Sequence, residues 1–138
     1  MGVDSDIKKA SEFYEKSKCG RGYYQLGILV EKYKGGIVLS RYNVSTCYRK
    51  SAELNYAKGQ AAYGRKQLQS GNVASALEWI HKSVAQKCPE GMFELGKIYE
   101  DGVKGVPRNY ETAREWYEKA AAGGHRKAEI RLGWLALN

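Results

Sequence analysis

The chain has 138 residues, of which 43% are hydrophobic and 28% are charged, with two prolines and a formal net charge of +8. This length and apolar content correspond to one folded domain and exclude a disordered chain. No run of apolar residues is long enough to cross a membrane as a helix.

Hydrophobic spacing predicts a succession of helices, because apolar residues recur at intervals of three and four. In chain order, the predicted ranges are 6–18, 21–33, 44–56, 57–69, 72–87, 89–101, 109–122 and 126–137. Asp4, Ser5 or Asp6 is expected to cap the first helix. Gly71 and Asn72 are expected to form the turn after the fourth.

The clearest unit spans residues 89–125, where two helices flank a loop that contains two glycines and a proline. Leu95 and Tyr99 share one face of the first helix, and Gly96 lies beside them. Glycine inside a helix costs about 1 kcal/mol relative to alanine, so we expect Gly96 to allow close approach of a second helix. The apolar stripe of that second helix consists of Ala113, Trp116, Tyr117, Ala120 and Ala121.

Both features recur along the chain at intervals of 32 to 37 residues. The glycine positions are Leu26-Gly27, Tyr63-Gly64, Leu95-Gly96 and Leu132-Gly133. The corresponding stripes are Ala10/Phe13/Tyr14/Ser17, Cys47/Tyr48/Ser51/Ala52, Ala76/Trp79/Ile80/Ser83 and Ala113/Trp116/Tyr117/Ala120. Two landmarks that keep one period indicate a solenoid, in which each helix pair buries its apolar face on the next.

Residues 89–125 resemble a Sel1-like repeat, a relative of the tetratricopeptide repeat. The matching residues are Leu95, Gly96, Tyr99, Gly102, Gly105, Val106, Trp116, Tyr117, Ala120, Ala121 and Gly124. Asn109 stands where the family usually has an acidic residue. Residues 126–138 also match, whereas residues 21–56 are divergent and carry Gly35-Gly36-Ile37-Val38 as their loop.

The resemblance implies an all-α fold, a right-handed superhelical solenoid of antiparallel helix pairs with about three full repeats. A single domain of residues 1–138 would then comprise an N-terminal half-repeat 1–20, a repeat 21–56, a short tetratricopeptide-like repeat 57–88, the Sel1-like repeat 89–125 and a C-terminal half-repeat 126–138. The resemblance also implies binding of proteins or peptides on the concave side, without enzymatic activity as a general property.

Positive charge is concentrated in the middle of the chain. Residues 32–87 hold ten basic side chains against only Glu53 and Glu78, whereas the two flanks are balanced. The residues proposed as a basic patch are Arg49, Lys50, Lys66 and Lys82. Such a block favours an anionic partner, and the tyrosines within it could stack nucleobases. Tyr48 and Tyr63 fall at seam positions, however, and no nucleic-acid motif is present.

The first helix of each pair is expected to line the concave surface, with side chains opposite the seam pointing into a groove. The predicted partner-binding residues are Arg21, Tyr24, Ile28, Lys32, Lys58, Arg65, Leu68, Phe93, Lys97 and Trp134. A groove of aromatic and cationic side chains suits an acidic, partly apolar peptide.

The three cysteines and two histidines lack metal-ligand spacing, so no metal or cofactor is predicted. Cys47 and Cys88 fall about 13 Å apart along the repeat axis, too far for a disulfide. Free thiols favour a cytoplasmic location, and the polar start is not itself a signal peptide; a periplasmic or secreted location would follow if a signal peptide had been removed. His81 and His125 are expected on helix surfaces.

No catalytic motif is present, so we expect a non-catalytic scaffold or adaptor that binds an acidic protein or peptide. One alternative is an inhibitor or immunity protein that neutralises a toxin or enzyme, as small bacterial solenoids can. A second is binding to nucleic acid or another anionic polymer, and a third, from the resemblance, is β-lactam hydrolysis. The C-terminal helix, with Trp134 and Leu137, could also mediate self-association.

Overall fold

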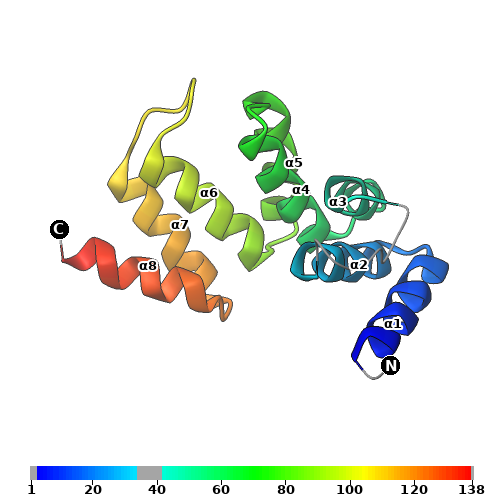
Figure 1. Ribbon diagram of the computed structural model, residues 1–138. Coiled ribbons are helices and arrows are strands. Elements are labelled where there is room, and N and C mark those ends of the chain that lie inside the picture. The colour runs from blue at the N-terminus through cyan, green and yellow to red at the C-terminus, as the bar shows by residue number, and fades with distance from the viewer. Residues whose placement is uncertain (1–2, 34–41, 138) are drawn as a thin grey trace.

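The computed structural model describes residues 3–33 and 42–137, and the helices within them stack side by side along one axis (Figure 1). They are α1 (Val3–Ser17), α2 (Gly20–Lys32), α3 (Val44–Glu53), α4 (Ala57–Gln69), α5 (Val73–Ala85), α6 (Pro89–Asp101), α7 (Tyr110–Ala122) and α8 (Arg126–Ala136). The predicted helices and the all-α solenoid are confirmed. The predicted loop at residues 35–38 lies outside the described residues.

The helices form two layers. Each helix packs against its neighbours in sequence, and α4 also contacts both α2 and α6. The first helices of successive pairs, α2, α4 and α6, therefore form one surface, and α3, α5 and α7 stand behind them. The described ends of the chain lie at opposite ends of the stack (Figure 1).

The repeated glycines allow the close helix approach that the sequence predicts. Each of three glycines lies under a side chain from the second helix of its own pair: Gly27 under Tyr48, Gly64 under Ile80, and Gly96 under Tyr117. A Cβ at any of these glycines would lie 2.6 to 2.7 Å from that side chain, closer than real Cβ contacts allow. The seam is thus a steric requirement of the fold.

The loop between α6 and α7 is held by its backbone. Gly102 has a φ of 72°, a conformation that glycine adopts readily. Val103 and Val106 then pair through two backbone hydrogen bonds. Asn109, which stands where the repeat that residues 89–125 resemble usually has an acidic residue, caps α7 by accepting a hydrogen bond from the Thr112 amide at 3.1 Å. An amide oxygen serves this capping role as well as a carboxylate does.

Three sequence-based expectations are wrong in detail. The first helix begins at Val3, so Asp4, Ser5 and Asp6 lie inside its first turn and not before it. The third ends at Glu53, because Asn55 has a φ of 64° and the backbone leaves the helix there. Phe13, placed in an apolar stripe, is 70% exposed.

Candidate partner-binding groove

A groove of about 300 Å³ crosses the surface formed by the first helices, between α2, α4, α6 and the start of α8. We call it the central groove. Its lining residues are Tyr24, Ile28, Glu31, Tyr48, Lys58, Ala61, Ala62, Arg65, Glu90, Phe93, Glu94, His125, Arg126 and Lys127. The lining combines aromatic, small and charged side chains, as ligand pockets commonly do.

Aromatic side chains stand on two sides of the central groove. On the α2 side, the Tyr24 ring lies 5.9 Å from that of Tyr48 and 5.5 Å from that of Tyr56. On the other side, Phe93 stacks on His125 with ring centroids 4.5 Å apart and an interplanar angle of 24°. The two aromatic groups come from repeats far apart in sequence, and the stacking of first helices brings them to one groove.

His125 is not an ordinary helix-surface side chain, in contrast to the prediction. It is the N-cap of α8, and its Nδ1 accepts a hydrogen bond from the Ala128 amide at 3.3 Å. Burial lowers its pKa, with Lys127 acting in the same direction and Glu90 opposing. The imidazole is therefore held neutral near physiological pH, as an acceptor at Nδ1 requires.

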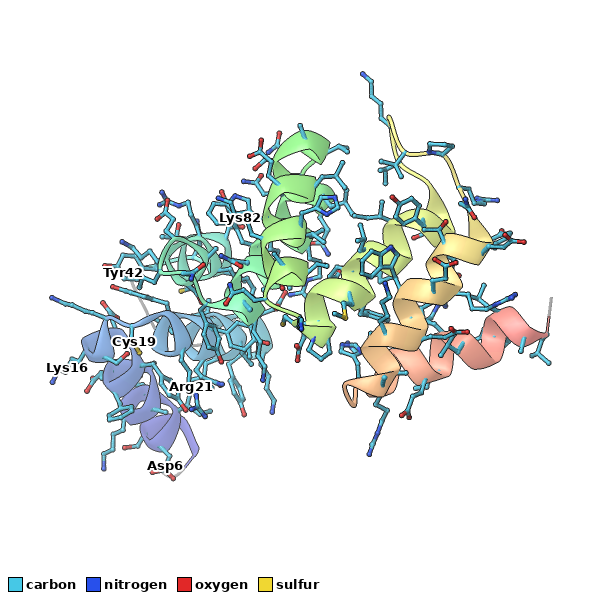
Figure 2. All side chains as sticks on the ribbon, turned by 180° about the vertical axis from the view of Figure 1, so that it is seen from behind. Asp6, Lys16, Cys19, Arg21, Tyr42 and Lys82 are labelled. Atoms are coloured by element: carbon cyan, nitrogen blue, oxygen red, sulfur yellow. The ribbon has the colours of Figure 1, made fainter. Side chains whose placement is uncertain are left out.

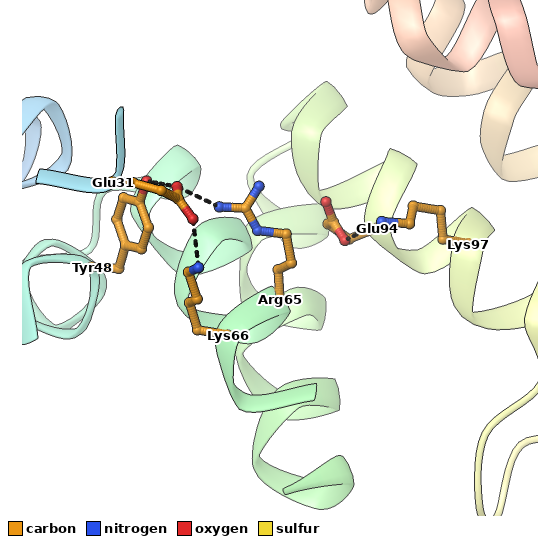
Figure 3. Close-up of polar contacts among 6 residues, drawn as sticks. All are labelled: Glu31, Tyr48, Arg65, Lys66, Glu94 and Lys97. Atoms are coloured by element: carbon orange, nitrogen blue, oxygen red, sulfur yellow. Dashed lines mark hydrogen bonds and ion pairs between the residues drawn. The ribbon is translucent and has the colours of Figure 1, made fainter. Parts of the chain in front are cut away.

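Glu31 ties three helices together beside the central groove (Figure 3). It accepts hydrogen bonds from the Tyr48 hydroxyl at 2.9 Å, from Arg65 at 3.4 Å and from Lys66 at 2.5 Å. Burial alone would raise the pKa of Glu31, but the bonds from Lys66 and Tyr48 and the charge of Arg65 outweigh it and lower that pKa. Glu31 thus offsets one of the two positive charges that Arg65 and Lys66 carry, so part of the predicted basic charge is balanced within the chain.

Glu100 has the same role in the unit formed by α6 and α7. It accepts a hydrogen bond from the Tyr117 hydroxyl at 2.6 Å and a paired contact from the Arg131 guanidinium. The pKa of Glu100 is raised by burial but lowered overall by the bonds from Arg131 and Tyr117. In both places a carboxylate of one first helix joins its own second helix to the next first helix.

We expect acid to weaken the fold through these two carboxylates. The folded pKa of Glu31 and of Glu100 lies below the ordinary value of 4.5, so their stabilisation is present above that pH. It is lost as pH falls through the folded values. The free energy of unfolding in urea should therefore decrease below about pH 4.5, and Glu31→Gln with Glu100→Gln should flatten that decrease. An unchanged pH profile in the double variant would contradict this assignment.

The central groove carries both signs of charge. Glu94 on α6 is 9% exposed, and its nearest cation is Lys97 at 3.7 Å. Burial raises the pKa of Glu94, while the charges of Lys97 and Arg65 oppose the rise. Among the described residues, three carboxylates and four cations line the groove, so its excess of positive charge is smaller there than the composition of residues 32–87 indicated.

Half of the predicted partner-binding residues meet in the central groove, namely Tyr24, Ile28, Lys58, Arg65 and Phe93. Lys97 lies in an adjoining hollow with Phe93, Glu100, Asp101 and Arg131. Arg21 lies at the α1–α2 end of the molecule, close to Cys19 (Figure 2).

The other three predicted partner-binding residues lie elsewhere. Leu68 lies four residues after Gly64, on the side of α4 that faces α5, and packs against the buried cluster of Ile80, Leu95 and Ile98. Lys32 lies over the Tyr33 ring at 5.4 Å. Trp134 is 59% exposed on α8 and does not line the central groove. Leu68 is therefore a core residue and not a groove residue.

The predicted basic patch is spread over three helices. Lys66 on α4 is paired with Glu31, and Lys50 on α3 lies over two tyrosine rings. Lys82 on α5 lies 4.3 Å from the Trp79 ring centroid and stands apart from Arg21 in Figure 2. Arg49 is exposed on α3. These cations do not converge on the central groove.

Sequence reasoning missed several lining residues of the groove, including the three carboxylates and the residues at the start of α8: Glu31, Glu90, Glu94, His125, Arg126 and Lys127. A signal for some of them was available in the repeat. Lys58, Glu90 and Lys127 occupy the same repeat position, the second residue of each first helix, just before a small residue. Lys58 was in the groove prediction, and applying the same position to α6 and α8 would have added Glu90 and Lys127.

The cysteines are free thiols, with Cys19 exposed and Cys47 and Cys88 buried. Burial raises the pKa of Cys47 to about 12, which keeps it protonated and unreactive. Among the described residues, no group of His, Cys, Asp or Glu could hold a metal ion. No described helix combines the length and apolar character needed to cross a bilayer.

Comparison with known families identifies the repeat. The Sel1 repeat model matches residues 1–19 and 89–125, which agrees with the resemblance found in the sequence. The first segment covers α1, and the second covers the complete pair of α6 and α7.

Two yeast proteins are similar to the chain. Chitin synthase regulatory factor 3 of Schizosaccharomyces pombe is 27% identical over 159 residues, covering 96% of this chain and 16% of the relative. Chitin synthase regulator SKT5 of Saccharomyces cerevisiae is 42% identical over 57 residues, covering 41% of this chain and 8% of the relative. The chain thus spans a small fraction of either protein.

Two solved bacterial structures share the fold. The c5321 protective antigen of uropathogenic Escherichia coli, which displays an SLR fold, superposes with a TM-score of 0.77 and 26% identity. That match covers 99% of this chain and 31% of the antigen. A Sel1 repeat protein from Oxalobacter formigenes gives a TM-score of 0.59 and 26% identity, covering 94% of this chain and 96% of that protein.

Proposed function

We propose that this chain, which is an α-solenoid of Sel1-like repeats, is a non-catalytic adaptor that binds a polypeptide segment of a partner protein in the central groove. The observation that carries the proposal is the convergence of two aromatic groups, Tyr24 with Tyr48 and Phe93 with His125, on one groove with exposed cations at its edge. Aromatic and cationic side chains are the common anchors of protein interfaces.

An unsatisfied donor supports a ligand with acceptor atoms. The Nε of Arg65 is buried and has no hydrogen-bond partner among the described residues. An unpaired buried donor is costly, and a carbonyl or carboxylate of a bound segment could relieve that cost once the Arg65 side chain turns toward the groove. Arg65 shares Glu31 with Lys66, so its charge is only partly balanced, and the exposed cations among the described groove residues are Lys58, Arg126 and Lys127.

We propose a partner segment with a bulky apolar residue flanked by acidic ones. The apolar side chain would contact Tyr24 and His125, the half-buried members of the two aromatic groups, and the acidic ones would face Lys58, Arg126 and Lys127. Glu90 and Glu94 on the same surface would disfavour a uniformly acidic polymer such as nucleic acid.

The yeast relatives indicate what kind of partner to seek. Both carry names of chitin synthase regulators, which supports a role in which the solenoid binds an enzyme or its assembly factors and controls its activity. The inhibitor or immunity role is a special case, in which binding silences a toxin or enzyme in a one-to-one complex.

The test is capture of partners with three forms of the chain after nuclease treatment. We expect wild type to retain one or a few proteins and Lys58→Glu with Lys127→Glu to lose them, with a loss of affinity of at least tenfold. Lys104→Glu with Arg114→Glu is the matched control, because it makes the same change of charge at exposed sites outside the central groove.

The outcomes separate the candidate functions. Equal capture by both charge variants would place the partner site outside the central groove. Retention of nucleic acid alone, with affinity that falls steeply as salt rises, would favour the anionic-polymer alternative. Turnover of a β-lactam by wild type would overturn the non-catalytic proposal.

A further inference from the structure

Within the described part of the chain, helix α8 has an uncovered seam glycine, whereas the seam glycines of the first helices α2, α4 and α6 are all covered. In the three complete pairs, a side chain of the second helix covers the seam glycine of the first: Tyr48 on Gly27, Ile80 on Gly64 and Tyr117 on Gly96. Gly133 holds the same repeat position on α8. Among the described residues, nothing lies within 4 Å of a Cβ built at Gly133. The three filled pairs therefore specify what would cover it, namely a second-type helix.

The contacts of α1 are those of a second helix of a pair, the type to which α3, α5 and α7 belong; we call this a second-type helix. Its Ser17 meets Gly22 of α2 so closely that a Cβ at this glycine would overlap the serine hydroxyl. The same contact joins the other second-type helices to the first helix that follows them, with Ser51 on Gly59 and Ser83 on Gly91. Helix α1 therefore stands in the position of α3 and α5, and its first-type partner is not among the described residues.

The side of α1 that would face such a partner is open. Phe13 is 70% exposed, whereas Trp116 at the same repeat position packs against Leu95 and Ile98. Ile7 and Ser11, on the side toward α2, are buried. Among the described residues, the buried side chains of α1 are thus those on the side that faces α2.

The serine hydroxyls show the same difference. Ser51 and Ser83 each donate a hydrogen bond to the first residue of their own first helix, at 2.6 Å to the Gly20 carbonyl and at 2.8 Å to the Ala57 carbonyl. Ser17 instead donates to the Tyr14 carbonyl of its own helix at 2.6 Å. The interaction that normally joins the two helices of a pair is therefore replaced on α1 by a local one.

We propose that copies of this chain associate head to tail, with α1 of one copy seated on α8 of the next, so that the superhelix continues across the contact. The register of the internal pairs places Tyr14 on Gly133, Ser17 at the Arg126 carbonyl and Phe13 near Leu132. The two open faces lie at opposite ends of the molecule (Figure 1), so one chain cannot join its own ends. Such a heterologous contact extends without closing.

The proposed contact contains one pair of opposite charges and one hydroxyl without an acceptor. Glu129 takes the repeat position of Met92, and Lys18 takes that of Ala121, two residues that pack against one core cluster. A carboxylate of one copy would thus lie near an ammonium of the next. Leu137 takes the position of Glu100, so the Tyr14 hydroxyl would lack the carboxylate that Tyr117 has.

The proposal, which does not depend on the central groove, is tested by sedimentation velocity of the 138-residue chain over a range of concentrations. We expect the average mass of wild type to rise with concentration beyond that of a dimer. Gly133→Leu and Phe13→Glu should each remain monomeric, because each blocks one of the two faces. Both substitutions are at open sites, so helicity and unfolding temperature should not fall.

Mixing the two blocked variants gives the sharpest result. Each retains the face that the other lacks, so an equimolar mixture should form a dimer and nothing larger. An α8-to-α8 dimer would be lost in Gly133→Leu, kept in Phe13→Glu and not restored by mixing. A wild type that stays monomeric at every concentration, or a mixture that does not dimerise, would overturn the head-to-tail proposal.

A third variant tests the register. Leu137→Glu should tighten association by about tenfold, because it supplies an acceptor for the Tyr14 hydroxyl, as Glu31 does for Tyr48. Non-specific contact through an apolar surface would instead weaken when an exposed leucine becomes charged, and that result would contradict the proposed register. Tyr110→Glu is the control for Phe13→Glu: it places the same charge at an exposed aromatic residue outside the contact, and it should associate as wild type does.

Discussion

Replacing Tyr117 by alanine should destabilise the fold by about 3–5 kcal/mol, the range for truncating a large aromatic side chain in a core. Tyr117 is fully buried, covers Gly96 and contacts the Phe93 ring at a centroid distance of 5.7 Å. Its loss would leave a cavity in the seam of the last complete pair. Urea unfolding followed by circular dichroism measures the effect.

Tyr117→Phe separates the contribution of the hydroxyl to stability from that of the ring. It keeps the packing on Gly96 but removes the hydrogen bond to Glu100, so we expect about 1.5–3 kcal/mol of destabilisation, the range for bonds to charged groups. The control is Tyr110→Ala, which removes a tyrosine ring that is 50% exposed and should change stability by less than about 0.5 kcal/mol. A Tyr117→Ala variant as stable as that control would show that the seam does not hold the repeat together.

The same substitution at two repeat positions should have opposite effects. Gly96→Ala places a Cβ 2.7 Å from the Tyr117 ring, and overpacking of this kind costs about 1–3 kcal/mol. Gly133→Ala meets nothing within 4 Å among the described residues. It should raise stability by about 0.5–1 kcal/mol, because alanine favours a helix more than glycine does.

Thermal and urea unfolding of both variants measure this difference directly. Helix preference alone predicts that both substitutions stabilise, so only the close approach of Tyr117 explains a loss at Gly96. Equal gains at both positions would mean that α7 can move away from α6 at little cost. Gly133→Ala should be measured at low concentration, where the proposed head-to-tail contact does not contribute.

Several residues of the central groove could be predicted because the chain repeats. A period fixed by Gly27, Gly64 and Gly96 assigns the residues of a first helix to a seam side or a groove side, and three residues assigned to the groove side, Tyr24, Lys58 and Phe93, line one groove. The prediction for Leu68 was wrong because this residue lies four positions after Gly64 and therefore on the seam side of α4, where it packs against Ile80, Leu95 and Ile98.

The charge of the groove was less predictable. A count along the sequence treats Arg65 and Lys66 as free cations, although Glu31, 34 residues before Arg65, pairs with both and offsets one of their two charges. The count also omits Arg126 and Lys127, which reach the groove only because α8 starts beside α6. Which opposite charges meet depends on the turn of the superhelix between successive repeats.

The sequence by itself determined the helices, the period, the seam glycines and the membership in a repeat fold, because each of these follows from local spacing of apolar and small residues. Only the tertiary structure decided which side chains share the central groove, which cations are already paired, and that Phe13 and Gly133 lie on open faces. The physical reason is that contacts between helices distant in sequence depend on how the pairs stack. That geometry is set by all the seams together and by no single stretch of the chain.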